Sequence, residues 1–248
     1  MADLVCGINP VREALSGGMR RALRLLVAEG GKNRRIEPLL RLAEERGVSV
    51  GRRPRGELDR LCGGLRHQDV VLLLEPFRYC PFEDLLDRWR ASGRHAFFLL
   101  LDGVTDPHNL GAIARSAEVA GCHGLILPRD RSCPVTAVAE RAAAGALNHL
   151  PVCRVTNLAR TMDELRRQGI WLYGLAGEDE AVNLFEVDLG GDVALVVGAE
   201  GRGLRPNIRG RCDRLLAIPM FGRVSSLNAS VAAGIALFEV VRQKFRDG

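Results

Sequence analysis

The sequence of 248 residues is poor in lysine, in aromatic residues and in long apolar runs. Only two of its 35 basic residues are lysine, and aromatic residues make up 5%. No run approaches the roughly 18 apolar residues that a membrane span requires. The N-terminus MADLVCGINP has neither the basic start nor the apolar core of a secretion signal. We therefore expect no membrane association and a location in the cytoplasm.

Cysteine and histidine patterns typical of cross-linked or metal-binding proteins are also missing. The seven cysteines are odd in number and form no CxxC pair, and the five histidines show no HxxxH or HExxH spacing. A disulfide framework and a zinc site are both disfavoured by these spacings. We expect no metal ion.

The positive charge is concentrated near the N-terminus. Residues 1–80 hold 15 Lys and Arg against 10 Asp and Glu, whereas residues 81–248 hold 20 of each. A basic module joined to a nearly neutral body is typical of nucleic-acid binding, because phosphate contacts supply much of the affinity. Solvated arginines and genome composition explain the same excess, so charge alone leaves RNA binding open.

Short helical and strand patterns alternate in the first 75 residues. Residues 9–17, with Asn9 as the cap, and 36–46 have helical spacing, whereas 23–28 and 70–74 are strand-like. They predict a small αβ domain over residues 1–75. Residues 76–94 contain Pro76 and Pro81 and are the expected linker.

The remaining residues, 95–248, are predicted to form an α/β domain with a parallel sheet. Apolar runs of strand length alternate there with helical patterns, and ligands in such folds gather at the carboxyl ends of the strands. The expected strands are 96–101, 124–127, 170–175, 193–197 and 215–218.

Three loops that follow these strands carry unusual residues and are expected to converge. In the first, Asn109 is predicted to cap a helix over 112–120, with Arg115 about one and a half turns in. The second, 197–204, has three glycines around Glu200 in a spacing that is not GxGxxG. The alternatives are a surface ion pair for Arg115 and an ordinary Gly-rich turn.

The third loop, residues 218–230, is rich in Ser and Asn and precedes a helix predicted over 231–245. Free N–H groups at the start of that helix suit a ligand that carries a carboxylate. An ordinary capped helix is the alternative, but it does not explain why three such loops meet.

The stretches NLGAIARSAEVAG, VVGAEGRGL and IPMFGRVSSLNASVAAGIALFE resemble, in order and spacing, the three motifs of the SpoU-type (TrmH-like) RNA ribose 2′-O-methyltransferases of the SPOUT superfamily. CGINPVREALSGG and RHQDVV are similar to the small L30e-like RNA-binding domain in the ribosomal-RNA branch of that family. The resemblance implies S-adenosylmethionine as methyl donor, a deep trefoil knot in the catalytic domain and a homodimer. Only the resemblance supports a knot, because knots are rare in proteins.

Site residues follow from the same motifs. The resemblance implies an active-site set of Asn109, Arg115, Glu200, Ser226 and Asn228. It places the donor against Ala176, Gly177, Gly198, Ile218, Met220 and Leu227. The chain departs from the family pattern at Ser225, where an acidic residue is usual, and at Asp69, which replaces the Gly of an HQG triplet.

The function implied is methyl transfer to a ribose 2′-hydroxyl of RNA, with a guanosine of 23S rRNA as the expected target. A tRNA 2′-O-methyltransferase of the same family is the first alternative. A catalytically inactive RNA-binding or ribosome-associated protein is the second. A nucleotide-dependent oxidoreductase is disfavoured because no early Gly-rich turn follows a first strand.

Overall fold

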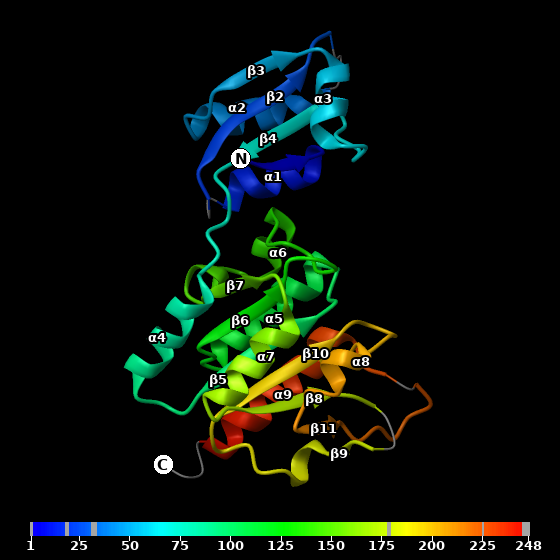
Figure 1. Ribbon diagram of the computed structural model, residues 1–248. Helices are drawn as coiled ribbons and strands as arrows, with labels where there is room; N and C mark the ends of the chain where they lie inside the picture. The colour runs from blue at the N-terminus through cyan, green and yellow to red at the C-terminus, as the bar shows by residue number, and fades with distance from the viewer. Residues whose placement is uncertain (1, 18–19, 31–33, 178–179, 225, 245–248) are drawn as a thin grey trace. The chain divides into compact units, whose positions relative to one another are not determined.

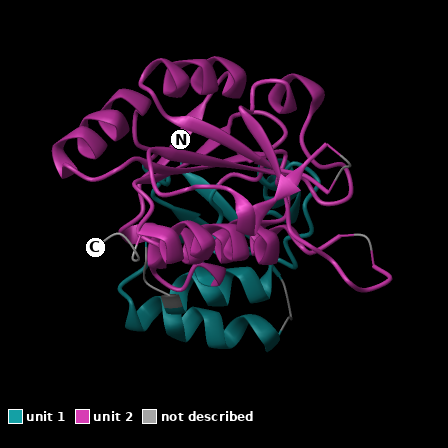
Figure 2. Cartoon of the chain, turned by 90° about the horizontal axis from the view of Figure 1, so that it is seen from below, with its two compact units in different colours: residues 1–78, 135–141 teal, residues 79–134, 142–248 magenta. Residues whose placement is uncertain are grey.

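The computed structural model describes residues 2–17, 20–30, 34–177, 180–224 and 226–244. The chain forms two compact units, coloured separately in Figure 2. Unit 1 comprises residues 1–78 with 135–141, and unit 2 comprises 79–134 with 142–248. None of the helices in the described ranges is long and apolar enough to cross a membrane.

Unit 1 is a four-stranded sheet with helices on both faces. Its strand order is β1-β4-β2-β3, and only the β2–β3 pair is parallel. Alternate residues of β4 face opposite sides, so Val70 and Leu72 pack in one core and Val71 packs in the other. The elements are β1 (Asp3–Cys6), α1 (Ile8–Gly17), β2 (Ala22–Ala28), η1 (Arg34–Ile36), α2 (Glu37–Glu45), β3 (Val50–Arg53), α3 (Arg55–Cys62) and β4 (Val70–Leu74).

The strongest patterns in this part of the sequence are confirmed, namely the two longer strands and the first two helices. Three short elements, β1, β3 and α3, were not expected. The β3 sequence VGRR carries two arginines and has no apolar alternation to reveal a strand. The predicted cap at Asn9 is wrong, because α1 begins at Ile8 and Asn9 lies within it.

Unit 2 contains a seven-stranded sheet in the order β7-β6-β5-β10-β8-β11-β9, and every pair is parallel (Figure 1). Its strands are β5 (Phe97–Asp102), β6 (Gly124–Pro128), β7 (Val152–Val155), β8 (Trp171–Leu175), β9 (Val182–Asn183), β10 (Val193–Gly198) and β11 (Arg214–Ala217). The helical segments are α4 (Phe82–Ser92), α5 (Pro107–Val119), α6 (Ala137–Ala142), η2 (Ala146–Asn148), α7 (Leu158–Arg167), η3 (Leu184–Glu186), α8 (Pro206–Arg209) and α9 (Ala229–Lys244). Residues 137–141 of α6 belong to unit 1.

Both faces of the central strands are covered. Phe98 and Leu100 of β5 share a core with leucines of α4 and α7. Phe97, Leu99 and Leu101 point to the other face and are equally buried. Helices α5 and α9 pack against each other, α5 against β6 and α9 against β10. Burial on both faces explains why the strands are continuous apolar runs, and the predicted parallel α/β fold is confirmed.

The predicted linker 76–94 is wrong over most of its length. It contains α4, whose Leu85 and Leu86 are buried in the core of unit 2. The Trp89 ring packs edge-on against Phe98, with ring centroids 5.9 Å apart. The division between the units falls after Arg78. Strands β7 and β9 were not expected either, because they are short and carry polar residues.

Candidate active site

The carboxyl ends of β5, β10 and β11 lie along one edge of the parallel sheet. Strands β5 and β10 are neighbours, with Asp102 opposite Gly198, and β8 separates β10 from β11. The loops that follow these strands therefore leave the sheet at the same edge. This arrangement agrees with the convergence expected from the sequence.

The first loop leads into α5, which begins earlier than expected. The Asp106 carboxylate accepts a hydrogen bond from the His108 N–H (2.9 Å) and caps the helix, and Pro107 occupies its first position. The predicted cap at Asn109 is therefore wrong. Asn109 lies in the first turn instead, where its side chain is buried and free to bind residues outside the helix.

The second loop is a tight turn in which Gly198 is sterically required. Ala199 and Gly203 exchange two backbone hydrogen bonds of 3.1 and 2.9 Å. A Cβ atom at Gly198 would lie 2.3 Å from the carbonyl carbon of Gly203, closer than any real contact. Gly201 and Gly203 have φ of +73° and +62°, which glycine adopts most easily. Because a side chain at position 198 would collide with the backbone of Gly203, this loop differs from an ordinary Gly-rich turn.

A buried ion pair fastens this loop to the end of β5. The Asp102 carboxylate is fully buried and accepts hydrogen bonds from the Arg205 backbone N–H (2.9 Å) and from its Nε (2.7 Å). Loss of Arg205 would leave a buried carboxylate without its charge partner, which is strongly unfavourable, although the Arg205 side chain itself is 34% exposed. Sequence reasoning missed both residues. The signal available was an Asp that directly follows five buried apolar residues.

The third loop is joined to the other two through Asn228. Its Oδ1 accepts hydrogen bonds from the N–H groups of Ser230 and Val231 and so caps α9. Its Nδ2 donates to Asn109 Oδ1 (3.0 Å) and to the Glu200 carboxylate. The Asn228 side chain therefore caps α9 and also forms hydrogen bonds with residues of the first two loops.

Glu200 is the common acceptor of this network. Its Oε1 accepts hydrogen bonds from Asn109 Nδ2 (3.0 Å), from Asn228 Nδ2 and from the Ala229 N–H (3.3 Å). The first three N–H groups of α9 are therefore occupied by Glu200 and Asn228. The expectation that these groups are free to bind a carboxylate of the ligand is wrong.

A pocket of about 380 Å³ opens beside this network. All six residues expected to contact the methyl donor line it, together with Glu200 and Ser226. Leu175, Val197 and Leu216 add apolar surface, and glycines expose backbone groups. The volume falls in the usual range for cofactor pockets. A mixture of apolar walls and backbone groups suits a ligand such as S-adenosylmethionine, which has apolar and polar parts.

The remaining residues of the expected active-site set do not line this pocket. Asn109 and Asn228 are connected to the pocket through Glu200, whereas Arg115 is exposed on α5 and is not part of the pocket lining. Ser225 lies outside the described residues. Within the described ranges, no three His, Cys, Asp or Glu side chains are grouped to hold a metal ion.

Two protein families match different parts of the chain. Residues 96–238 match the SpoU rRNA Methylase family, and residues 4–80 match the family described as RNA 2′-O ribose methyltransferase substrate binding. The chain belongs to the SpoU rRNA methylase family. This membership confirms the resemblance seen in the three motifs, and the second match makes the N-terminal unit a substrate-binding domain.

Named proteins align with most or nearly all of this chain. The 23S rRNA (guanosine-2′-O-)-methyltransferase RlmB of Escherichia coli is 44% identical, and the alignment covers 98% of this chain and 100% of that one. The SpoU methyltransferase AviRb of Streptomyces viridochromogenes, solved in complex with AdoMet, is 29% identical with a TM-score of 0.64, covering 99% of this chain and 91% of AviRb. The TrmH/SpoU tRNA modifying enzyme of A. aeolicus is 30% identical with a TM-score of 0.58, covering 67% of this chain and 85% of that enzyme.

Family membership, together with the AdoMet complex of AviRb, confirms the expectation of an S-adenosylmethionine-dependent methyltransferase. The sequence motifs alone were enough to make that assignment. The part of the site that they did not reveal is the Asp102–Arg205 pair beneath the second loop.

Replacing Gly198 with Ala is expected to raise the Kd for S-adenosylmethionine at least tenfold. The added methyl group must displace Gly203 and so distort the loop that lines the pocket, at a cost of about 1–3 kcal/mol in stability. Isothermal titration calorimetry and thermal unfolding measure the two effects. Gly191→Ala is the matched control, because its Cβ meets open space. Equal donor affinity in the two variants would contradict the role given to Gly198.

Proposed function

We propose that the chain transfers a methyl group from S-adenosylmethionine to the ribose 2′-hydroxyl of a guanosine in 23S rRNA. The observation that carries the proposal is the hydrogen-bonded set Asn109–Glu200–Asn228 at the rim of the pocket. The set joins all three family motifs. The E. coli relative supports the choice of substrate, since it matches at full length and is named for that reaction.

The residues of the pocket contribute mainly alignment. S-adenosylmethionine, when bound, supplies the electrophilic methyl group. The chain must hold the ribose hydroxyl in line with that group, and such positioning can contribute about 7–11 kcal/mol to lowering the barrier. Glu200, held by two amides and one backbone N–H, keeps a fixed place at the rim. Ile218, Met220 and Leu227 provide the apolar wall against which the donor is held.

Arg115 is proposed to bind the phosphate next to the target ribose. A guanidinium stays protonated in proteins and is a poor general base, but its planar fork matches phosphate oxygens. Its exposure on α5 leaves it accessible to RNA. As the bond from the 2′-oxygen to the methyl group forms and the sulfur–methyl bond breaks, the hydroxyl proton passes to the neighbouring phosphate, which Arg115 holds in place.

Ribosomal RNA is favoured over tRNA by the extent of the matches. The tRNA-modifying structure covers 67% of this chain, whereas the ribosomal-RNA enzyme covers 98% and therefore includes the substrate-binding domain. The inactive alternative is disfavoured because Asn109, Arg115, Glu200 and Asn228 are all present. A location in the cytoplasm and the knot implied by the resemblance stay predictions.

A homodimer is part of the proposal. Val119 near the end of α5 and Val231 and Phe238 on α9 are 64%, 49% and 47% exposed, although α5 and α9 pack together. A second copy of the chain, which the family resemblance implies, would cover these side chains. We expect sedimentation equilibrium to give the mass of two chains and Phe238→Asp to shift it to one. A single-chain mass for the unchanged protein would exclude the dimer.

The substrate is tested by mapping 2′-O-methyl groups. Incubation with S-adenosylmethionine is expected to methylate one guanosine in unmodified 23S rRNA and none in tRNA. Asn228→Asp is the inactive control, with turnover lowered about 100-fold, the usual order for loss of one preorganised donor. The Asp oxygen still caps α9, whereas the Nδ2 donor is lost and a second carboxylate faces Glu200. Methylation of tRNA alone would establish the alternative substrate.

Replacing Arg115 with Lys is expected to lower kcat about tenfold or more and to leave the Kd for S-adenosylmethionine unchanged. Lysine keeps the charge but loses the two-pronged contact with phosphate. Single-turnover methylation and calorimetry separate the two quantities. A Lys variant that retains the full kcat would refute the phosphate clamp.

A further inference from the structure

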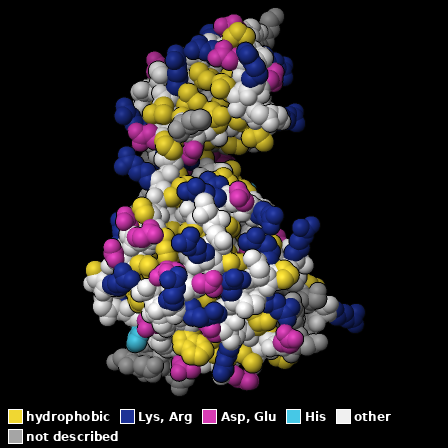
Figure 3. Space-filling view, in the orientation of Figure 1, with side chains coloured by type: hydrophobic (Ala, Val, Ile, Leu, Met, Phe, Trp, Pro, Cys, Tyr) yellow, Lys and Arg dark blue, Asp and Glu magenta, His cyan; other side chains and the backbone are white. Residues whose placement is uncertain are grey.

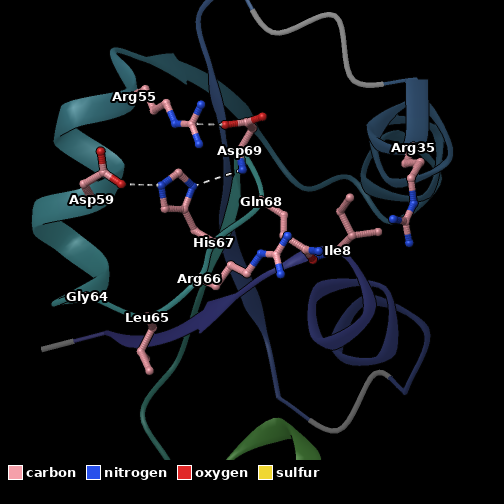
Figure 4. A pocket seen from close by; sticks show the side chains of 10 residues that line it. All are labelled: Ile8, Arg35, Arg55, Asp59, Gly64, Leu65, Arg66, His67, Gln68 and Asp69. Carbon is pink, nitrogen blue, oxygen red and sulfur yellow. Dashed lines mark hydrogen bonds and ion pairs between the residues drawn. The ribbon is translucent and has the colours of Figure 1, made fainter.

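Unit 1 contains a second hollow, of about 620 Å³, that the methyl-transfer site does not use (Figure 4). It is formed by the turn between α3 and β4 together with side chains from α1, η1 and α3. Three of the lining residues are the arginines Arg35, Arg55 and Arg66. In the view of Figure 4, Arg66 and Arg35 extend from opposite sides toward Ile8.

The floor of the hollow is a rigid turn. The Val70 N–H donates to the His67 carbonyl (3.0 Å), and Gln68 and Asp69 have φ of +51° and +66°, as in a type I′ turn. The buried His67 ring bridges the Asp59 carboxylate (2.8 Å) and the Asp69 N–H (3.0 Å). Gln68 Oε1 accepts a hydrogen bond from the Ile8 N–H (3.1 Å).

Asp69 is an unexpected residue in this turn. It replaces the glycine of the HQG triplet at a position where glycine has no steric cost and Asp is only tolerated. Its Oδ1 is buried and accepts no hydrogen bond from the described residues. Its charge partner is Arg55, whose Nε lies 3.6 Å away and whose side chain is 72% exposed. The Asp69 carboxylate therefore lies within ion-pair distance of the Arg55 guanidinium, which is largely exposed beside the hollow.

The hollow has an excess of positive charge. Its three arginines face two carboxylates, and Asp59 is already bound to His67. Arg66 is exposed, and its guanidinium has no hydrogen-bond or ion-pair partner in the parts of the chain that the structure describes. On the face of the molecule drawn in Figure 3, basic and acidic side chains are interspersed. The concentration of arginine around one cavity thus points to an anionic ligand.

We propose that this hollow holds one unpaired nucleotide of the RNA substrate, with its phosphate bound by Arg55 and Arg66 and with Asp69 as the residue that positions Arg55. The inference rests on the proposed function for the identity of the polyanion as RNA. Proteins read unpaired nucleotides by placing them in pockets and stacking bases on aromatic rings or guanidinium planes. Among the described residues, the lining contains no Phe, Tyr or Trp, and the His67 ring is buried with both nitrogens already bonded. The arginines are therefore the groups available both to bind the phosphate and to stack on the base. The cavity volume is ample for a nucleotide.

The phosphate contacts are tested with the full chain and an unmodified 23S rRNA transcript in filter-binding titrations at several salt concentrations. Arg55→Ala and Arg66→Ala are each expected to weaken binding about tenfold. Each is also expected to reduce the slope of log K against log salt by about 0.7. Arg41→Ala is the matched control, since this arginine is exposed on α2, outside the hollow. It removes the same charge and is expected to change affinity less than twofold.

Asp69→Gly and Asp69→Asn test the positioning role, because both residues suit the left-handed turn and preserve the fold. Removing a negative charge would by itself tighten RNA binding. If Asp69 positions Arg55, both substitutions are instead expected to lower the RNA affinity to about that of Arg55→Ala. In an Arg55→Ala background the same substitutions are expected to cause no further weakening.

Equal losses for Arg41→Ala and Arg66→Ala would overturn the proposal in favour of diffuse charge attraction. Unchanged RNA affinity in Arg66→Ala would exclude the hollow as a nucleotide site and leave a protein partner as its occupant. Tighter binding by Asp69→Gly in both backgrounds would remove the positioning role.

Methyl transfer is measured separately. RNA binding that follows the expected pattern without methylation contradicts the proposed function and leaves the nucleotide site intact.

Discussion

The hydrogen bonds accepted by the Glu200 carboxylate are the interaction on which the active site depends. They join Asn109 at the start of α5, Asn228 at the start of α9 and the second loop, three segments that are far apart in the sequence. A charged acceptor strengthens these bonds relative to neutral ones. Without it, the two amides would have no shared acceptor, and the loops around the pocket would lose their common anchor.

The second loop can offer that carboxylate only because its own backbone is constrained. Gly198 allows the chain to fold back within contact distance of Gly203, and the Asp102–Arg205 pair holds the far end of the loop against β5. The buried carboxylate of Asp102 has no access to water and depends on Arg205 for compensation. Steric and electrostatic constraints therefore act at opposite ends of one short segment.

Unit 1 follows a similar design at its own turn. The His67 ring is buried between a carboxylate and a backbone N–H, and this fixes the left-handed residues that follow it. The departure at Asp69 adds a charge where the family pattern has none. The partner of that charge is the largely exposed Arg55, and Asp69 belongs to neither of the two apolar clusters of this unit.

The sequence by itself determined the parallel α/β class, the larger strands, the family and six residues that line one pocket. Buried strands are continuous apolar runs, and the motifs are contiguous, so both can be recognised without knowledge of distant contacts. Only the tertiary structure showed that α4 belongs to unit 2, that Asp106 caps α5 and that the N–H groups of α9 are already bonded. It also revealed the Asp102–Arg205 pair, which joins residues 103 positions apart. Helix docking, capping and ion pairing depend on which groups meet in space, and no local pattern records those distances.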